Sequence, residues 1–197
     1  MKAQKHPSVI LLAGPNGSGK STTAPALLRG ALGVTEFVNV DVIAQGLSAF
    51  NPLAQALEAG RIMHARLREL AAGRASFAFE TTLASRSLAP WLAELTKSGY
   101  HFHLLFLWLP SADAAVARVA QRVRAGGHDV PEETVRRRHA AGLRNFFRLY
   151  CPLSESWIVY DNSCPATPEI VAAGAGSQVA FIADESKWHE VKKGAER

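Results

Sequence analysis

The sequence has few cysteines, the residues that stabilise many small proteins through disulfides or metal sites. It contains two cysteines, Cys151 and Cys164, and neither has a second C-x-x-C or a His-x-x-His pattern nearby. We therefore expect small, partly buried thiols rather than a zinc site or a disulfide. His101 and His103 would share one strand face, but a third ligand at suitable spacing is missing, so no metal pair is expected there.

The sequence also lacks long apolar runs and a targeting segment. No apolar run approaches the roughly 18 residues that span a bilayer, so a membrane is not an expected partner. The start, Met-Lys-Ala-Gln-Lys-His-Pro, leaves no room for a signal peptide before the first apolar stretch, which makes the cytosol the expected compartment. No repeat or linker divides the chain, and 48% hydrophobic content predicts a single domain over residues 1–197.

Acidic residues are outnumbered by basic ones, which gives a formal net charge of +5. A positive balance can indicate nucleic-acid binding. Here, however, the arginines concentrate between Arg118 and Arg148 rather than in tails or aromatic-rich repeats. A local clamp for phosphate groups explains this distribution better, so nucleic acid is not an expected partner.

The most specific motif lies near the amino terminus. Gly14, Gly19, Lys20 and Ser21 fit G-x-x-x-x-G-K-S/T directly after an apolar run. Such glycines let backbone N–H groups converge on phosphate oxygens at a helix N-terminus, the lysine reaches the β- and γ-phosphates, and the serine hydroxyl ligates Mg²⁺. A glycine-rich turn that binds nothing is the alternative, and the required order of strand, loop and helix argues against it. The predicted ATP- or GTP-binding residues of this loop are Gly14, Pro15, Asn16, Gly17, Ser18, Gly19, Lys20, Ser21 and Thr22.

Apolar strands and helical patterns alternate along the chain. Expected strands after the first cover residues 36–40, 76–79, 101–109 and 157–160, and expected helices cover 21–32, 52–72, 88–98, 112–124 and 132–149. This alternation predicts an α/β, nucleotide-kinase-like P-loop NTPase fold in three layers, with a mostly parallel sheet of five or six strands. We also expect a helical lid over about 111–150 and a carboxyl-terminal extension over about 165–197, with a short edge strand near 179–182 and a terminal helix.

The helix that opens at Asn51-Pro52 has an amphipathic pattern. Gly73 is expected to end it. The apolar side chains predicted to lie on or near its buried face are Leu53, Leu57, Ile62, Leu67 and Leu70.

Acceptor-side residues are expected at the carboxyl ends of the strands, where ligands bind to parallel sheets. Asp41 follows the second strand and is the predicted base for an acceptor hydroxyl, although it could instead cap the next helix. Glu80 follows the third strand and is expected to contact the acceptor or a Mg²⁺-bound water, with a structural cap or ion pair as the alternative. Thr81 and Thr82 can donate to a substrate phosphate or serve an ordinary turn, and Arg86 is a further acceptor-side candidate.

Residues 122–138 combine arginines with a Gly-Gly hinge between two helices. Such a lid can close over the triphosphate, exclude water and place guanidinium groups on the transferring phosphoryl. A solvated basic helix face is the alternative, and consecutive arginines cannot all point one way. The sequence leaves open which of these enter the site: Arg124, Arg136, Arg137 and Arg138.

Several motifs occur together in a fixed order over most of residues 8–163. They are Gly14-Pro-Asn-Gly-Ser-Gly-Lys-Ser-Thr, Asn39-x-Asp41, Phe77-Ala-Phe-Glu-Thr-Thr-Leu83, Arg122-Val-x-x-Gly-Gly-His-x-Val-Pro131, Arg137-Arg138 and Asp161-Asn-Ser163. This ordered set resembles the zeta toxin family of P-loop kinases. The resemblance implies transfer of phosphate from ATP or GTP to a small acceptor, which for founding members is a UDP-activated amino sugar. The roles it implies are a phosphate lysine at Lys20, a base at Asp41, acceptor contacts at Glu80 and Thr82, lid arginines at Arg122 and Arg137, and a position near the nucleotide base for Asn162.

The chain is more compact than the founding toxins and resembles a stand-alone branch. The acceptor, toxicity and an antitoxin partner therefore stay open. Two other functions also fit the residues: a nucleoside, shikimate or gluconate-like kinase, and a nucleotide-switched binding protein that hydrolyses ATP slowly. A carboxylate base and a lid favour a kinase, because a switch needs neither.

Overall fold

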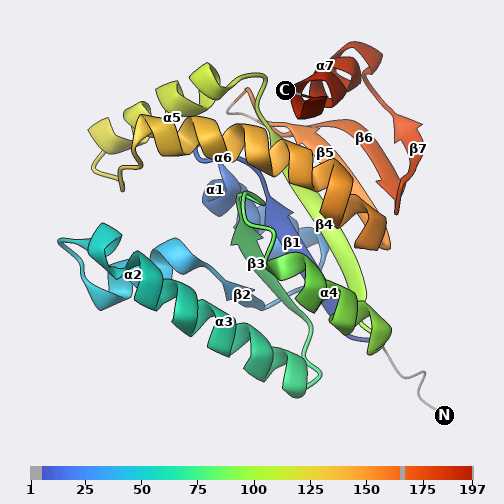
Figure 1. Cartoon of the computed structure of the whole chain (residues 1–197), viewed down its shortest axis with the longest axis horizontal. Helices are drawn as coiled ribbons and strands as arrows, with labels where there is room; N and C mark the ends of the chain where they lie inside the picture. Colours follow the sequence, from blue (N-terminus) through green and yellow to red (C-terminus); the bar gives the residue numbers. More distant parts are fainter. Residues whose placement is uncertain (1–5, 165–166, 197) are drawn as a thin grey trace.

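The computed structural model describes residues 6–164 and 167–196. The first five residues, on which the expectation about a signal peptide depends, lie outside the described residues, as do 165–166 and 197 within the predicted extension. The described strands form a sheet in the order β2-β3-β1-β4-β5-β6-β7 (Figure 1). Their bounds are β1 Ser8–Ala13, β2 Glu36–Val38, β3 Phe77–Thr81, β4 His101–Trp108, β5 Ser156–Asp161, β6 Glu169–Ala175 and β7 Gln178–Ile182.

Helices cover both faces of this sheet, which confirms the three-layer α/β fold. Side chains alternate along β1, so that Val9 and Leu11 pack with α3, α4, α6 and α7, while Ile10 and Leu12 pack with α1 and the turns after it. The helices are α1 Lys20–Ala24, α2 Val40–Leu47, α3 Ala56–Ala72, α4 Leu88–Lys97, α5 Ala112–Arg124, α6 Glu132–Asn145 and α7 Glu185–Glu196, with π-helical turns at Pro25–Ala31 and Phe146–Tyr150 and 3₁₀ turns at Pro52–Gln55 and Cys151–Leu153.

The sheet has more strands than the sequence predicted. Strands β1 to β5 are parallel, but β6 and β7 add an antiparallel hairpin, which makes a seven-stranded sheet. The prediction of five or six strands was wrong because β6 is rich in alanine and glycine, which have little strand propensity. Gly174 fits there because a Cβ atom would lie 2.4 Å from the Trp157 ring.

The expected buried face of α3 was only partly correct. Leu67 and Leu70 are buried, as predicted, together with Ala59 and Met63. The helix begins at Ala56, later than expected, and the 3₁₀ turn Pro52–Gln55 before it has no buried residue. The predicted core residues that are exposed instead are Leu53 (50%), Leu57 (83%) and Ile62 (38%).

The histidine pair and the cysteines carry no metal site within residues 6–164 and 167–196. His101 pairs with Glu155, and His103 Nδ1 lies 2.8 Å from a serine hydroxyl on β5. Cys151 is buried and Cys164 is exposed, and both are free thiols. Among the described helices, none is long and apolar enough to cross a bilayer.

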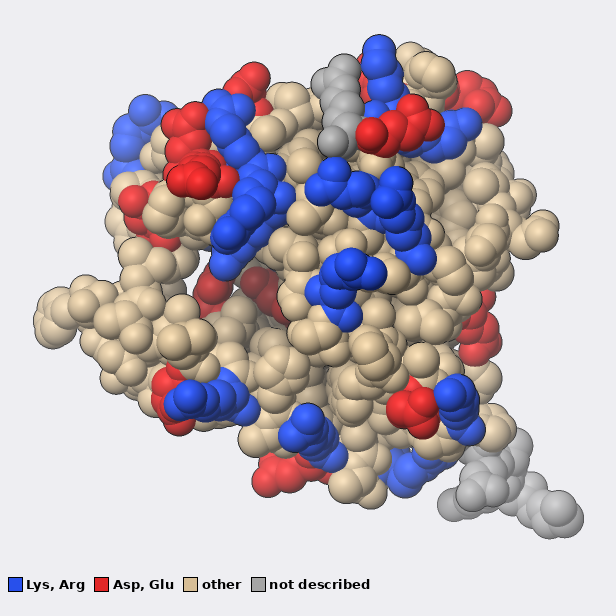
Figure 2. All heavy atoms as spheres, in the orientation of Figure 1, with Lys and Arg blue, Asp and Glu red and all other residues tan. Residues whose placement is uncertain are grey.

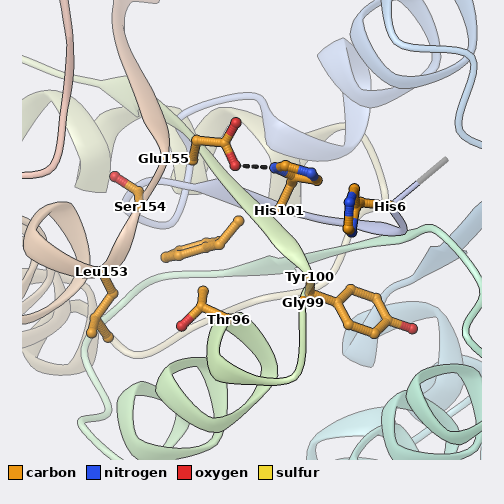
Figure 3. Close-up of a pocket in the computed structure, with 9 residues that line it drawn as sticks. His6, Thr96, Gly99, Tyr100, His101, Leu153, Ser154 and Glu155 are labelled. Carbon is orange, nitrogen blue, oxygen red and sulfur yellow. Dashed lines mark hydrogen bonds and ion pairs between the residues drawn. The ribbon is translucent and has the colours of Figure 1, made fainter. Parts of the chain in front are cut away.

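A pocket of about 390 Å³ lies at the amino ends of the parallel strands (Figure 3). His6, His101 and Glu155 are among the residues that line it. The His6 and His101 rings meet edge to face with centroids 5.2 Å apart. The phosphate-binding motif lies at the other end of the same strands. Ligands of such sheets bind at the carboxyl ends, so the pocket in Figure 3 is separate from the expected site.

Candidate active site

The loop after β1 is shaped by close packing against its surroundings. Gly14 has a φ of +142°, and a Cβ atom there would lie 2.3 Å from the Leu107 carbonyl oxygen. Gly19 has a φ of +82°, and a Cβ atom there would lie 2.6 Å from the Asn162 carboxamide nitrogen. Only glycine fits at both positions without displacing backbone or a buried amide. The loop is therefore held as a fixed cradle before α1.

Asn162 supports this loop from β5. Its carboxamide donates to the Ser18 carbonyl oxygen over 2.6 Å, and the residue is buried. The neighbouring Asp161 pairs with Lys187 of α7 at 2.9 Å, and these donors hold the pKa of the Asp161 carboxyl below its usual value despite burial. Asn162, which was predicted to lie near a nucleotide base, thus uses its carboxamide to hydrogen-bond the backbone of the loop.

Lys20 is buried at the base of the loop. Its ammonium group donates to the carbonyl oxygens of Gly14 and Pro15, both at 2.9 Å. Burial lowers its pKa, while the nearby carboxylates of Glu80 and Asp41 oppose that shift. Two carboxylates, one on β3 and one on α2, therefore favour the charged form of Lys20 against the effect of its burial.

Glu80 lies near the carboxyl end of β3, and its carboxylate contacts Ser21 in the first turn of α1. The Ser21 hydroxyl donates to Glu80 Oε2 over 3.0 Å and accepts from Asn39 Nδ2 over 3.3 Å. Burial raises the pKa of Glu80, and the charge of Lys20 and the Ser21 hydrogen bond counteract this effect. The arrangement places a hydroxyl oxygen and a carboxylate oxygen side by side, which is the hard oxygen chemistry that Mg²⁺ prefers.

Asp41 lies in the first turn of α2 and is partly exposed. The alternative that it caps this helix is wrong, because Asn39 is the cap. The Asn39 side-chain oxygen accepts from the backbone N–H of Asp41 over 2.8 Å and of Val42 over 3.2 Å. The Asp41 carboxylate is thus left for another task, and its charge acts on Lys20 and on Arg138 of α6.

The lid arginines have different surroundings. Arg122 has buried Nε and Nη2 atoms that find no hydrogen-bond partner among the described residues, and its charge acts on Lys20 and Glu80. Buried guanidinium donors are costly to leave unpaired, so this side chain is prepared for an anion. The sequence pointed to Arg137 as its partner, but Arg137 is exposed, whereas Arg138 donates to Asn16 Oδ1 over 3.4 Å.

Arg136 joins the two helices of the predicted lid. It pairs with Asp113 of α5 at 2.6 Å and with Glu132 at 2.8 Å, which ties α5 to α6. Arg124 is exposed at the end of α5. The sequence left open which of the consecutive arginines enters the site. Successive residues point in different directions around α6, and the half-buried Arg138 is the one that contacts the loop.

The connection after β3 is fastened to α6. Gly142 packs so closely that a Cβ atom would lie 2.2 Å from the Thr82 carbonyl oxygen, and Asn145 donates to the Leu83 carbonyl oxygen over 2.7 Å. Leu83 is fully buried with a φ of +57°, a conformation that such contacts must stabilise. Sequence reasoning missed Gly142 and Asn145, because their partners are distant in the chain.

The remaining predicted acceptor residues lie on this same connection. Thr81 and Thr82 use their hydroxyl oxygens to accept backbone N–H groups two residues onward, at 3.1 Å and 3.5 Å. This is the ordinary turn role that was the alternative for both threonines, and each hydroxyl keeps its proton for a further acceptor. Arg86 is exposed.

The space-filling view shows a hollow on this face of the molecule. Acidic side chains lie inside it, basic side chains line the rim nearer α5 and α6, and an uncharged lobe forms the other side, where Figure 1 draws the α2–α3 connection (Figure 2). A cleft with cations on one wall and carboxylates at its floor can bind a polyphosphate and activate a hydroxyl beside it.

Comparison with known proteins identifies a family and a fold. A family model described as an AAA domain matches residues 9–149. An uncharacterised protein of Haemophilus influenzae is 28% identical over 134 residues, which cover 66% of this chain and 91% of that protein.

Solved structures with this fold include toxin–antitoxin proteins and kinases. The AvrRxo1-ORF1:AvrRxo1-ORF2 complex with sulphate ions matches with a TM-score of 0.73 and 16% identity, covering 94% of this chain and 63% of that chain. The PezAT toxin–antitoxin system of Streptococcus pneumoniae matches with a TM-score of 0.66 and 14% identity, over 99% and 86% of the two chains. A protein described as a putative kinase of Chloroflexus aurantiacus matches with a TM-score of 0.55 and 18% identity, over 70% and 79%. The fold implied by the zeta toxin resemblance is confirmed.

Proposed function

Because the chain belongs to the AAA-domain family of nucleotide-binding P-loop proteins, we propose that it is an ATP-dependent small-molecule kinase. It transfers the γ-phosphate of ATP or GTP to a hydroxyl of a small acceptor. The observation that carries this proposal is Arg122, whose buried guanidinium nitrogens lack a partner among the described residues beside the loop lysine. A phosphoryl group in transfer supplies the anion that this side chain is built to meet.

Residues on the loop side bind and polarise the phosphate donor. The backbone of residues 14–22 holds the phosphates, Lys20 neutralises charge on the β- and γ-phosphates, and Arg122 and Arg138 stabilise the charge that develops on the γ-phosphoryl. The lid brings both arginines over the loop and excludes water, which would otherwise compete with the acceptor. Arg137 is assigned to the surface of the lid.

Ser21 and Glu80 fit the requirements of a Mg²⁺ site. Their oxygens lie 3.0 Å apart, and Asn39 orients the hydroxyl. Ser21 would ligate the ion directly and Glu80 would hold one of its water molecules, as in other P-loop sites. The ion supplies charge neutralisation for the triphosphate when it is bound.

Asp41 acts on the acceptor. Its carboxylate takes the proton of the acceptor hydroxyl as the acceptor oxygen bonds to the γ-phosphorus. The bond from that phosphorus to the oxygen bridging the β- and γ-phosphates breaks at the same time, and ADP or GDP leaves. Thr81, Thr82 and Arg86 line the acceptor side of this reaction.

The zeta toxin resemblance makes a UDP-activated amino sugar one candidate acceptor, and sugar acids, shikimate-like acids and nucleosides are others. The similar solved structures come from complexes or systems with a second protein, the AvrRxo1-ORF1:AvrRxo1-ORF2 complex and the PezAT system. An antitoxin-like partner is therefore part of the proposal. The cytosol, where ATP is abundant, is its proposed compartment.

The test uses a metabolite extract incubated with the protein, ATP and Mg²⁺ and followed by mass spectrometry. The proposal expects one species to gain a single phosphate, and Lys20→Ala should abolish this gain. The second candidate function, a nucleotide-switched binding protein, predicts no phosphorylated species and ATP-stimulated binding of RNA or DNA. That second result would overturn the kinase proposal.

A further inference from the structure

One face of α6 contacts both sides of the cleft. Arg138, Gly142 and Asn145 are spaced i, i+4 and i+7 along this helix and therefore lie in one stripe on its surface. At one end of the stripe, Arg138 donates to Asn16 Oδ1 of the phosphate-binding loop over 3.4 Å. The other end lies about two turns, or about 10 Å, further along the helix. It meets residues 82–87, the β3–α4 connection, which Figure 1 draws beside α6.

The β3–α4 connection presents consecutive backbone carbonyl groups to this stripe. The Thr82 carbonyl oxygen packs against Gly142, where a Cβ atom would lie only 2.2 Å from it. Asn145 Nδ2 donates to the next two carbonyl oxygens, that of Leu83 over 2.7 Å and that of Ala84 over 3.2 Å. The path of the connection is therefore set by α6 and not only by the strand from which it leaves.

The same two residues of the connection also hold the threonine hydroxyls. The backbone N–H of Leu83 donates to Thr81 Oγ1 over 3.1 Å, and that of Ala84 donates to Thr82 Oγ1 over 3.5 Å. Asn145 binds the carbonyl oxygens of these residues, and the threonines bind their N–H groups. The positions of both hydroxyls, which are proposed acceptor contacts, therefore depend on Asn145.

The π-helical turn that continues α6 holds the next part of the connection. Within this turn, the Tyr150 hydroxyl donates to the Ser85 carbonyl oxygen over 2.7 Å, directly before Arg86. Leu83, which is fully buried, has a φ of +57°, a backbone conformation that persists only where its surroundings hold it. The contacts from α6 and its continuation supply that support.

Phosphoryl transfer requires this kind of control over distance. The acceptor oxygen must lie in line with the γ-phosphorus, and a displacement of about 1 Å caused by a residue far from the reacting atoms can slow a reaction by about 10²-fold. Arg138 is assigned to the γ-phosphoryl, and the threonines are assigned to the acceptor. Because one helix contacts both groups of residues, its length sets the spacing between them.

We propose that Asn145 is a positioning residue for the transfer step. Its carboxamide holds the β3–α4 connection at a fixed spacing from Arg138 and thereby places the acceptor hydroxyl in line with the γ-phosphorus. This inference rests on the proposed kinase function. It concerns the acceptor alone, because a water molecule that attacks ATP needs no support from the connection. Asn145 therefore controls transfer to the acceptor and leaves ATP binding and the slow hydrolysis of ATP unchanged.

The experiment compares two variants that each keep the approximate shape of a side chain and remove its hydrogen-bond donor. Asn145→Leu removes the donor to the connection at the carboxyl end of β3. Tyr100→Phe is the matched control, because the Tyr100 hydroxyl donates to the Ala75 carbonyl oxygen over 2.9 Å at the amino end of the same strand. Mass spectrometry of a metabolite extract incubated with protein, ATP and Mg²⁺ measures transfer. Release of inorganic phosphate from ATP in buffer without the extract measures hydrolysis.

Asn145→Leu should slow transfer by about tenfold or more, with hydrolysis and ATP affinity within about twofold of the parent. Tyr100→Phe should leave the ratio of transfer to hydrolysis unchanged. An equal loss of transfer and hydrolysis in Asn145→Leu would reduce Asn145 to a support of the fold and overturn the inference. Parental transfer in a folded Asn145→Leu would overturn it as well. Both results leave the kinase proposal standing, whereas a parent protein that phosphorylates no species removes both.

A second variant tests the same spacing with every donor in place. Gly142→Ala puts a methyl group against the Thr82 carbonyl oxygen and should push the connection away from α6, which lowers the ratio of transfer to hydrolysis in the same direction. Gly60→Ala on α3 is its control, because a Cβ atom there meets nothing within 4 Å. Melting temperatures establish that the variants are folded. A folded Gly142→Ala with the parental ratio would contradict the inference.

Discussion

The two sides of the cleft are built in opposite ways. On the nucleotide side, glycines touch neighbouring backbone, Lys20 is buried, and Asn162 fixes the loop from the carboxyl end of β5. On the side of the proposed base Asp41, residues 42–57 contain no charged residue and leave large side chains such as Phe50 fully exposed. The nucleotide side is thus fixed by packing among the described residues, whereas residues 42–57 carry large apolar side chains that the described residues leave exposed.

This difference separates common chemistry from specificity. Binding a triphosphate requires the same backbone amides and cations in any P-loop kinase, so its geometry can be fixed by packing. Acceptors differ, so their recognition belongs to surfaces that the core does not constrain. α6 connects the two sides, because it carries Arg138 toward Asn16 and fastens Leu83 through Asn145. The following variants test whether residues of the two sides affect ATP binding and turnover independently.

Lys20→Ala has the largest expected effect. It removes the buried positive charge that neutralises the β- and γ-phosphates, and turnover should fall by about 10³-fold or more with weaker ATP binding. Steady-state kinetics and ATP titration measure both. Lys97→Ala is the control, because Lys97 is exposed and pairs with Glu94 on α4, and its activity should match the parent. Near-normal turnover of Lys20→Ala would mean that this loop is not the active nucleotide site.

Asp41→Asn should reduce turnover by about 10²-fold or more, because asparagine cannot take the hydroxyl proton. Melting temperature and ATP affinity should stay near parental values, since Asn39 and not Asp41 caps α2. Asn39→Ala provides the contrast and should lower the stability by about 1 kcal/mol. If Asp41→Asn kept turnover within a few-fold of the parent, Glu80 would become the candidate base.

Arg122→Ala and Arg138→Ala should each reduce turnover by about 10- to 100-fold, because each removes a guanidinium from the transferring phosphoryl. Arg137→Ala is the matched control on the same helix and should have little effect, since Arg137 is exposed. Comparing kcat for the three variants tests the assignment. A larger loss in Arg137→Ala than in Arg138→Ala would show that the lid rotates between this structure and the reactive state.

The smallest expected effect is a shift in pH dependence. Protonated Lys20 binds phosphate, so ATP affinity should fall as the pH rises through the pKa of this lysine. Burial lowers that pKa and Glu80 opposes the shift, so Glu80→Gln should move the loss of affinity to lower pH. ATP titrations from neutral to alkaline pH measure the midpoint, with Glu58→Gln on the exposed part of α3 as the control. An unchanged midpoint in Glu80→Gln would contradict the coupling.

Sequence reasoning predicted the element order because hydrophobic periodicity and turn residues are local. The helix over 112–124 and the strand starting at His101 were placed at their observed bounds. It failed where burial depends on residues distant in the chain. Leu57 has the helical spacing of a core residue but is 83% exposed. It also missed β6, where Gly174 lies so close to the Trp157 ring that no larger residue fits.

The sequence by itself determined that this chain holds a phosphate-binding loop in an α/β sheet, because the motif is contiguous and its glycines, lysine and serine act through neighbouring backbone. Only the tertiary structure decided which arginine faces the loop, that Asn39 frees Asp41 from capping, and that Glu80 meets Ser21. These choices depend on helix rotation and on strands that are neighbours in space and not in sequence. Residues 42–57 depend on both: the sequence determines that they carry no charge, and only the tertiary structure decides that their large apolar side chains stay exposed among the described residues, because no neighbouring element packs over them there.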